Sequence, residues 1–254
     1  YYSVDENNNY IPSIMLQITD DKSISAVHGN DNGDIADNSL IDVLKAKIAE
    51  IMSLDSEMSV SDDIIPRIDA SKLLNTIENK VAKGKELTKE ELIFIYGLER
   101  NVESIGYPRE RDFRVNSLIA KRNVKKDMAT IFECEEALVG DKPSDLQNTL
   151  MVYYGDLDIG SAYSYKSLIN YTFPRIVIGT IDASYVETAS NVNFPDTIMG
   201  GFLHLSSLKT MENVTLPSKC NYMDLSSLVE IKTPTFVPID KMRVELPQIF
   251  PLIS

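Results

Sequence analysis

Side chains suited to nucleophilic catalysis are few in this sequence. It contains two cysteines, Cys134 and Cys220, and two histidines, His28 and His204. A cysteine or serine nucleophile needs a base beside it, and a pair of His204 with either cysteine stays open, although no spacing favours it. Cys134 follows an apolar helical pattern and is interpreted as a core residue, whereas Cys220 falls at a turn of a repeat. The sequence favours a non-enzymatic protein but leaves an enzyme open, and no catalytic residue is assigned.

Signatures of cofactor and metal sites are also missing from the sequence. The eleven glycines never fall into the spacing of a dinucleotide or phosphate loop, and the cysteines and histidines do not have zinc spacing. The segment HGNDNGDIADNS, residues 28–39, has the composition of a calcium loop. Its twelfth residue is Ser39, where such a loop carries a bidentate glutamate. We therefore expect a polar loop there, no cofactor and no metal ligands.

The charge is negative overall and unevenly distributed. A net charge of −13 argues against direct binding to nucleic acid or to an anionic membrane, because both need clustered lysine and arginine. Residues 71–127 are the exception, with a net charge of +4. Their bases include Arg109, Arg111, Arg114, Lys121, Arg122, Lys125 and Lys126. Phe113 is the one aromatic residue among these bases, and a nucleic-acid site would need several as stacking platforms. A solvated helix face against the acidic N-terminal part is therefore favoured over a phosphate or nucleic-acid patch.

The compartment is inferred from cysteine usage and hydropathy. The apolar runs are too short to cross a bilayer. Two cysteines far apart in sequence, without a secretory signal, favour a reducing, cytoplasmic location. The chain starts with Tyr1 rather than methionine, which indicates a fragment or a processed form of something longer.

An α+β domain is predicted for residues 1–150. Residues 14–19 and 23–29 alternate apolar and polar side chains around an Asp-Asp-Lys turn, which indicates a hairpin. The hairpin belongs to a small antiparallel sheet within residues 1–36, and the YYSV segment is a candidate for a further strand.

Helices are predicted within residues 38–135 from their apolar spacing and their start and stop signals. Ser39 and Asp69 are expected to cap the first two helices, and Gly84 to end the second. Thr88 and Glu91 form a capping box for a third helix that continues through Val102. Two shorter helices follow, around Val115 to Ile119 and around Met128 to Phe132.

Residues 151–254 repeat themselves at an interval of about twenty residues. The dipeptides Phe173-Pro174, Phe194-Pro195, Leu216-Pro217 and Val237-Pro238 are spaced by 21, 22 and 21 residues. Such a period marks a solenoid, in which each unit buries its apolar face only by stacking on its neighbours. We predict a leucine-rich-repeat-like β-solenoid of four coils, with one parallel strand per coil and a C-terminal cap formed by residues 241–254. Three buried columns are expected: Leu157, Ile181, Leu203 and Met223; Ile159, Ala183, Leu205 and Leu225; and Phe173, Phe194, Leu216 and Val237.

The outward side of the same strands is the candidate binding surface, because side chains alternate along a strand. The expected outward positions are Asp158, Asp182, His204 and Asp224 in one row, flanked by Asp156, Thr180, Phe202 and Tyr222. Exposed aromatic side chains beside charges are typical anchors of a protein interface. The candidate partner-binding residues are Asp156, Asp158, Asp182, Phe202, His204, Tyr222 and Asp224. The alternative is a solvated face whose aromatic residues are covered by the helical part, and binding of a cation by the aspartate row stays undecided.

Several motifs together resemble those of a group of uncharacterised bacterial and phage-type proteins. These motifs are KELTKEELIFIYGLE, ESIGYPRERDFRV and RNVKKDMATIFECE, followed by Gly-x-Leu-x-Leu-Ser-Ser-Leu…Leu-Pro repeats. The region IPSIMLQITDDKSISAVHG is also similar to the segment that precedes the helices in that group. The resemblance implies an architecture and no particular activity. The first two repeats lack the Leu-Ser-Ser-Leu signature, so the array in this chain is short and degenerate.

The leading functional hypothesis is a non-enzymatic protein-interaction module that binds a protein partner through the strand face of the solenoid. The acidic row favours a basic partner, and neither nucleic acid nor membrane is expected to bind directly. Two alternatives stay open. One is the substrate-selecting fragment of a larger enzyme or effector whose catalytic part lies upstream, and the other is an acidic inhibitor that mimics nucleic acid.

Overall fold

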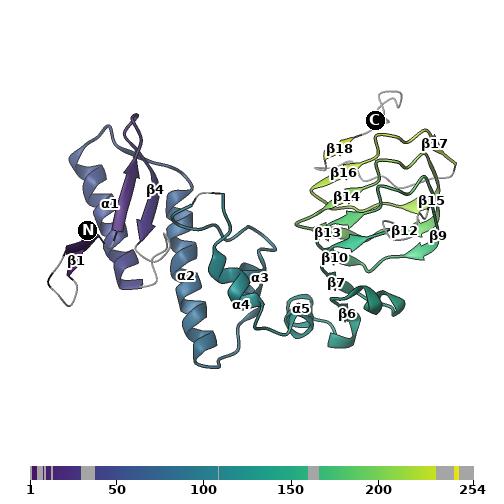
Figure 1. Ribbon diagram of the computed structural model, residues 1–254, viewed down its shortest axis with the longest axis horizontal. Helices are drawn as coiled ribbons and strands as arrows, with labels where there is room; N and C mark the ends of the chain where they lie inside the picture. The colour runs from purple at the N-terminus through teal and green to yellow at the C-terminus, as the bar shows by residue number, and fades with distance from the viewer. Residues whose placement is uncertain are drawn as a thin grey trace. The chain divides into compact units, whose positions relative to one another are not determined.

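The chain folds into two compact units, residues 1–122 and 123–254. The computed structural model in Figure 1 describes residues 2–4, 8, 10–12, 14–29, 38–107, 109–159, 166–232 and 243–245. The first unit contains small sheets and helices, and the second is dominated by a parallel β-solenoid. The predicted fold class is therefore confirmed.

The first unit contains a mixed three-stranded sheet. The described strands of the first unit are β1 (Tyr2–Val4), β2 (Tyr10–Pro12), β3 (Ile14–Ile18), β4 (Ser23–Gly29) and β5 (Ser59–Val60), of which β3, β4 and β5 form this sheet. Strands β3 and β4 form the predicted antiparallel hairpin. Strand β5 joins β4 in parallel, so this sheet is mixed rather than purely antiparallel. Strands β1 and β2 pair antiparallel in a sheet of their own, and the YYSV segment is indeed a strand.

Four helices of the first unit follow the predicted pattern, with corrected ends. They are α1 (Asn38–Leu54), α2 (Ile64–Ala82), α3 (Lys89–Tyr96) and α4 (Phe113–Ile119). Helix α1 begins one residue before the predicted cap Ser39. Helix α2 begins directly after Asp63, because Ile64 and Ile68 are already part of its buried stripe. The predicted cap Asp69 therefore lies inside α2, where it forms an ion pair with Lys45 of α1.

The start of helix α3 was predicted correctly, and its end was predicted wrongly. The Thr88 hydroxyl accepts from the backbone N–H of Glu91, and the Glu91 carboxylate accepts from the backbone N–H of Thr88. The capping box is therefore confirmed. The helix ends at Gly97, whose φ of 67° is left-handed and closes the last turn. Val102, predicted to continue this helix, lies beyond its end and is buried in the following segment.

The apolar core of the first unit lies between the hairpin and the two long helices. Its fully buried members include Ile24 and Val27 of β4, Ile41 of α1, and Ile64 and Ile68 of α2. Because all five side chains are 0 % exposed and belong to one cluster, the hairpin and helices α1 and α2 share one continuous core.

The second unit begins with a helix and two short 3-10 turns before the solenoid. These elements are α5 (Val124–Phe132), η1 (Glu136–Leu138) and η2 (Pro143–Gln147). Helix α5 contacts the first strands of the solenoid, β6 and β7. It therefore belongs to the compact unit that contains the solenoid, although the sequence groups residues up to 150 with the N-terminal domain.

The first three coils of the solenoid each contribute three short strands to three parallel sheets, and the fourth coil contributes β16 and β17. The strands are β6 (Val139–Gly140), β7 (Val152–Tyr154), β8 (Leu157–Asp158), β9 (Ser167–Thr172), β10 (Ile176–Ile178), β11 (Ile181–Asp182), β12 (Thr188–Asn193), β13 (Thr197–Met199), β14 (Phe202–His204), β15 (Thr210–Thr215), β16 (Tyr222–Asp224), β17 (Glu230–Ile231) and β18 (Arg243–Glu245). The sheets are β6-β7-β10-β13, β8-β11-β14-β16-β18 and β9-β12-β15-β17, and their strands stack coil upon coil in Figure 1. The prediction of one strand per coil was wrong, because the chain bends twice within each coil and pairs along all three walls.

The predicted buried columns are confirmed where the structure describes them. Ile181 stands opposite Leu157 on one side and Leu203 on the other, and Leu203 stands opposite Met223. These four side chains are at most 3 % exposed. The second column is buried apart from its first member, Ile159, which is only partly buried.

The third column contains stacked aromatic rings. The rings of Phe173 and Phe194 lie 5.0 Å apart with an interplanar angle of 14°, and Leu216 continues the column. Val237 lies outside the described residues. So does most of the predicted cap at residues 241–254, of which only β18 is described, paired in parallel with β16.

Asparagine side chains form a ladder along the sheet β9-β12-β15. Asn170, Asn191 and Asn213 all have left-handed backbones, with φ of 54°, 53° and 51°. Asparagine tolerates this conformation better than most residues. The Asn191 amide donates to Asn170 Oδ1 at 3.0 Å, and the Asn213 amide donates to Asn191 Oδ1 at 2.8 Å. Asn170 and Asn213 each begin an Asn-x-Thr pattern in the sequence, and both patterns therefore fall at equivalent positions of the repeat.

Candidate functional site

The predicted binding residues lie on the sheet β8-β11-β14-β16-β18. Backbone register places Asp182 between Asp158 and His204, and His204 between Asp182 and Asp224. Neighbouring strands in such a sheet are about 4.8 Å apart. We call the surface formed by Asp158, Asp182, Phe202, His204, Tyr222 and Asp224 the acid-aromatic face. The structure brings these residues together as one patch on one wall of the solenoid.

The centre of this face is a cluster of three rings. The Phe202 ring lies 5.9 Å from His204 and 6.2 Å from Tyr222, and His204 lies 6.5 Å from Tyr222. Phe202 and Tyr222 meet edge to face at 72°, an arrangement that aromatic rings favour. Phe202 remains 42 % exposed, and His204 and Tyr222 are half-buried. The rings therefore form a preassembled apolar platform that is open on one side.

Two aspartates of the face also hold the turns that follow their strands. Asp182 Oδ1 accepts from the Ser184 N–H, and Asp224 Oδ1 accepts from the Ser226 N–H, each at 3.0 Å. Hydrogen bonds from the Ser184 side chain and backbone lower the pKa of Asp182, and the nearby His204 lowers it further. These hydrogen bonds fix the orientation of both carboxylates, and the lowered pKa keeps Asp182 ionised.

Asp156 has a different position and role from the rest of the predicted set. It precedes β8, and its Oδ1 accepts from the Thr180 N–H of the next coil at 2.7 Å. This bond ties two coils together at the edge of the face. Asp158, in contrast, is an exposed member of the row and lies opposite Asp182. The two aspartates therefore place like charges on neighbouring strands, an arrangement that is mildly destabilising.

The cysteines do not have the properties of catalytic nucleophiles. Burial raises the pKa of Cys220 to about 11, and burial also raises the pKa of Cys134. A reactive cysteine has a lowered pKa, because the thiolate is the nucleophile. The Cys220 thiol instead donates a weak hydrogen bond to the Tyr222 carbonyl at 3.5 Å. His28 lies in the first unit, where its ring meets that of Tyr107 edge to face at 5.8 Å.

The candidate calcium loop falls mostly outside the described residues. His28 and Gly29 end β4, residues 30–37 lie outside the described part of the chain, and Ser39 is in α1. Among the described residues, no three histidine, cysteine, aspartate or glutamate side chains come together as a possible metal site.

The basic segment is only partly the solvated face that we expected. Arg114 is 7 % exposed and forms an ion pair with Asp112 at 2.7 Å, while its guanidinium also donates to Asn75 at 2.6 Å. Arg111 donates to the Ile95 carbonyl at 3.0 Å, and Lys125 forms an ion pair with Asp145 at 2.9 Å. The expectation was wrong for Arg114, because this guanidinium ties α4 to α2 inside the first unit.

Arg67 was missed at the sequence level. It is 1 % exposed and donates to the carbonyls of Ser25, Ser104 and Ile105. Its position between Ile64 and Ile68 on the buried stripe of α2 was the available signal. Its hydrogen bonds satisfy backbone carbonyls of two segments that are distant in sequence, which is a structural role.

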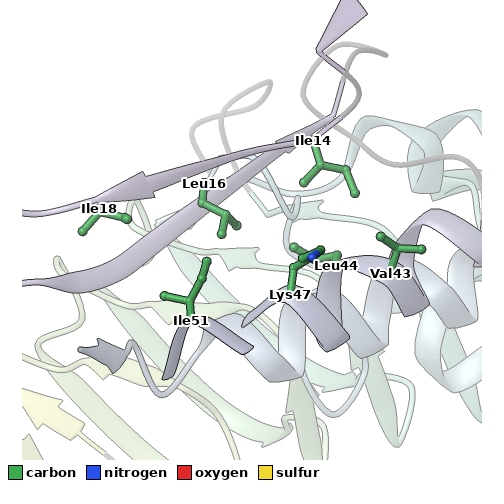
Figure 2. Close-up of a pocket in the computed structure, with 7 residues that line it drawn as sticks. All are labelled: Ile14, Leu16, Ile18, Val43, Leu44, Lys47 and Ile51. Carbon is green, nitrogen blue, oxygen red and sulfur yellow. The ribbon is translucent and has the colours of Figure 1, made fainter. Parts of the chain in front are cut away.

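An apolar groove between β3 and α1 was also not foreseen. It has a volume of about 360 Å³ and is lined by Ile14, Leu16, Ile18, Val43, Leu44, Lys47 and Ile51, as Figure 2 shows. Lys47 is the one ionisable residue of this lining, and its ammonium is paired with Glu50 at 2.6 Å. The groove offers apolar contact and no group arranged for chemistry.

Comparison of the chain with models of protein families, with curated proteins and with solved structures finds no match. Within the described residues, no helix has both the length and the apolar character required to cross a membrane.

Proposed function

We propose that the chain is a protein-interaction module whose solenoid binds a basic protein partner through the acid-aromatic face. The observation that carries the proposal is the ring cluster of Phe202, His204 and Tyr222, open to solvent within a row of aspartates. Solenoids bind partners along such regular surfaces. The proposal needs no reaction, cofactor or metal.

The rigidity of the face supports binding. Phe202, His204 and Tyr222 lie on strands that are paired on both sides within a parallel sheet. Their backbones are therefore ordered before a partner arrives, which reduces the entropy lost on association. Aromatic residues at the centre of an interface supply most of the binding free energy, at about 2 kcal/mol or more for a hot spot.

The charge of the face supports a basic partner. Asp158, Asp182 and Asp224 lie in one row around the rings, and the whole chain has a net charge of −13. Complementary charge speeds association and disfavours acidic competitors. The effect weakens with added salt, because the Debye length is about 8 Å at physiological ionic strength.

The test compares capture of partners by the intact chain and by three variants. The F202A/Y222A variant removes both large aromatic rings. The D158N/D182N/D224N variant removes the charges, and the asparagines at positions 182 and 224 keep an oxygen that can accept the turn hydrogen bonds. Y185A is the matched control, because Tyr185 is an exposed aromatic residue of the same solenoid and lies between β11 and β12, outside the face.

We expect a stoichiometric partner to bind wild type and Y185A and to bind F202A/Y222A at least about thirtyfold more weakly, the equivalent of about 2 kcal/mol. The asparagine variant should bind more slowly at low salt and lose this defect at high salt. A partner that binds F202A/Y222A as tightly as wild type would exclude the acid-aromatic face.

A further inference from the structure

Resting on the proposed function, we infer that the acid-aromatic face recognises an arginine side chain of the partner. The guanidinium stacks on the ring cluster and donates hydrogen bonds to Asp182 or Asp224. A basic partner could present either arginine or lysine at the centre of the face, and a guanidinium is the group that we assign there.

The ring cluster offers a surface on which a planar cation can lie. Phe202 and Tyr222 come from adjacent strands, and His204 lies two residues after Phe202 on the same side of β14. The three centroids are separated by 5.9 to 6.5 Å, so a guanidinium placed over one ring contacts another at its edge. A cation within about 6 Å of an aromatic centroid is attracted by the negative face of the ring.

Two carboxylates flank this platform in register. His204 stands directly between Asp182 and Asp224, one strand spacing, or about 4.8 Å, from each. The hydrogen bonds from Ser184 and Ser226 fix how these carboxylates point. An ionised carboxylate has about four lone-pair sites, so each can accept further hydrogen bonds from a cation lying over the rings.

The combination of rings and carboxylates favours arginine over lysine. A guanidinium is planar, weakly hydrated and able to stack while it donates in its own plane, whereas an ammonium is compact and strongly hydrated. A free metal ion fits less well, because the described residues do not bring three ligating side chains together. A purely apolar anchor would desolvate the flanking carboxylates without donating a hydrogen bond to them, at a cost in affinity.

The experiment titrates the full chain with three blocked pentapeptides that differ only in their central residue: arginine, lysine or citrulline. Citrulline keeps the planar shape of arginine and removes its charge. Amide shifts of residues 181–184, 202–205 and 222–226 are followed by NMR. We expect the arginine peptide to shift these amides with an affinity at least about fivefold higher than that of the lysine peptide, and the citrulline peptide to bind weakest.

Variants connect the preference to the named residues. F202A/Y222A and D182N/D224N should each abolish the arginine preference, whereas Y185A should retain it. Each variant is first shown to keep the wild-type circular dichroism spectrum and melting temperature. Equal binding of arginine and lysine peptides, or an arginine preference that survives in F202A/Y222A, would overturn the inference.

The experiments distinguish failure of the arginine anchor from failure of the binding face. If F202A/Y222A no longer binds the protein partner and wild type shows no preference for the arginine peptide, the acid-aromatic face is still the binding surface, but arginine is not its anchor. A protein partner that binds F202A/Y222A normally removes the face itself, whatever the peptides show.

Discussion

Substituting Leu203 by alanine tests the register of the solenoid most directly. Leu203 is 0 % exposed and stands in register between Ile181 and Met223. Strand β14 is paired with β11 on one side and β16 on the other, so the backbone has little freedom to move into a cavity. Leucine-to-alanine changes in cores cost about 2.7–5.0 kcal/mol, and the cost is larger where the site does not collapse. We therefore expect L203A to lower the free energy of unfolding by about 4 kcal/mol.

The measurement is urea denaturation followed by circular dichroism in the β-sheet region. With an m-value of about 2 kcal/mol per molar urea, the midpoint of the solenoid's transition should fall by about 2 M. V229A is the matched control, since Val229 is an apolar residue of the same solenoid that is 64 % exposed; exposed substitutions usually change stability by less than about 0.5 kcal/mol. A loss in L203A no larger than that in V229A would show that position 203 does not face the core.

Three further predictions concern other features of the solenoid. In G201A, an added Cβ would lie 1.9 Å from the Gly179 carbonyl oxygen, so we expect a loss of at least about 1–3 kcal/mol in thermal or chemical denaturation; unchanged stability would contradict the close approach of the coils. At the left-handed Asn191, whose φ is 53°, N191G should be more stable than N191A by about 1 kcal/mol, because glycine adopts this backbone without a Cβ clash; the reverse order would refute a left-handed bend. The pKa of Glu187 is lowered to about 2 by its hydrogen bonds and ion pairs with Lys166 and Lys209. A lowered pKa stabilises the fold above the ordinary glutamate range and loses this contribution as pH falls toward the folded value. Stability measured from pH 6 down to pH 2 should therefore fall less steeply in E187Q than in wild type, and identical profiles would show that the ion pairs contribute nothing.

The solenoid could be predicted from the sequence because its apolar residues recur at a fixed interval. A column such as Leu157, Ile181, Leu203 and Met223 is visible as a pattern, and stacking is the one arrangement that buries all four. The outward positions followed from strand alternation alone. The residues of the acid-aromatic face could therefore be named before their distances were known.

Other features depended on contacts between segments that have no fixed interval. The helical spacing of apolar residues continues to Val102, but α3 ends at Gly97. The burial of Arg67 and Arg114 follows from carbonyls and carboxylates supplied by distant segments. A basic residue in an apolar stripe does not by itself show which acceptors will surround it.

The sequence by itself determined the repeat, its buried columns and the side chains that share its outward face. The apolar residues recur at a regular interval along the chain, and side chains alternate between the two faces of a strand with a period of two residues. Only the tertiary structure decided that the coils have three walls, since each wall is a parallel sheet whose strands pair from one coil to the next. It also decided that Phe202, His204 and Tyr222 touch as one cluster. Their contact depends on the register between strands about twenty residues apart, and that register is set by the whole stacked core.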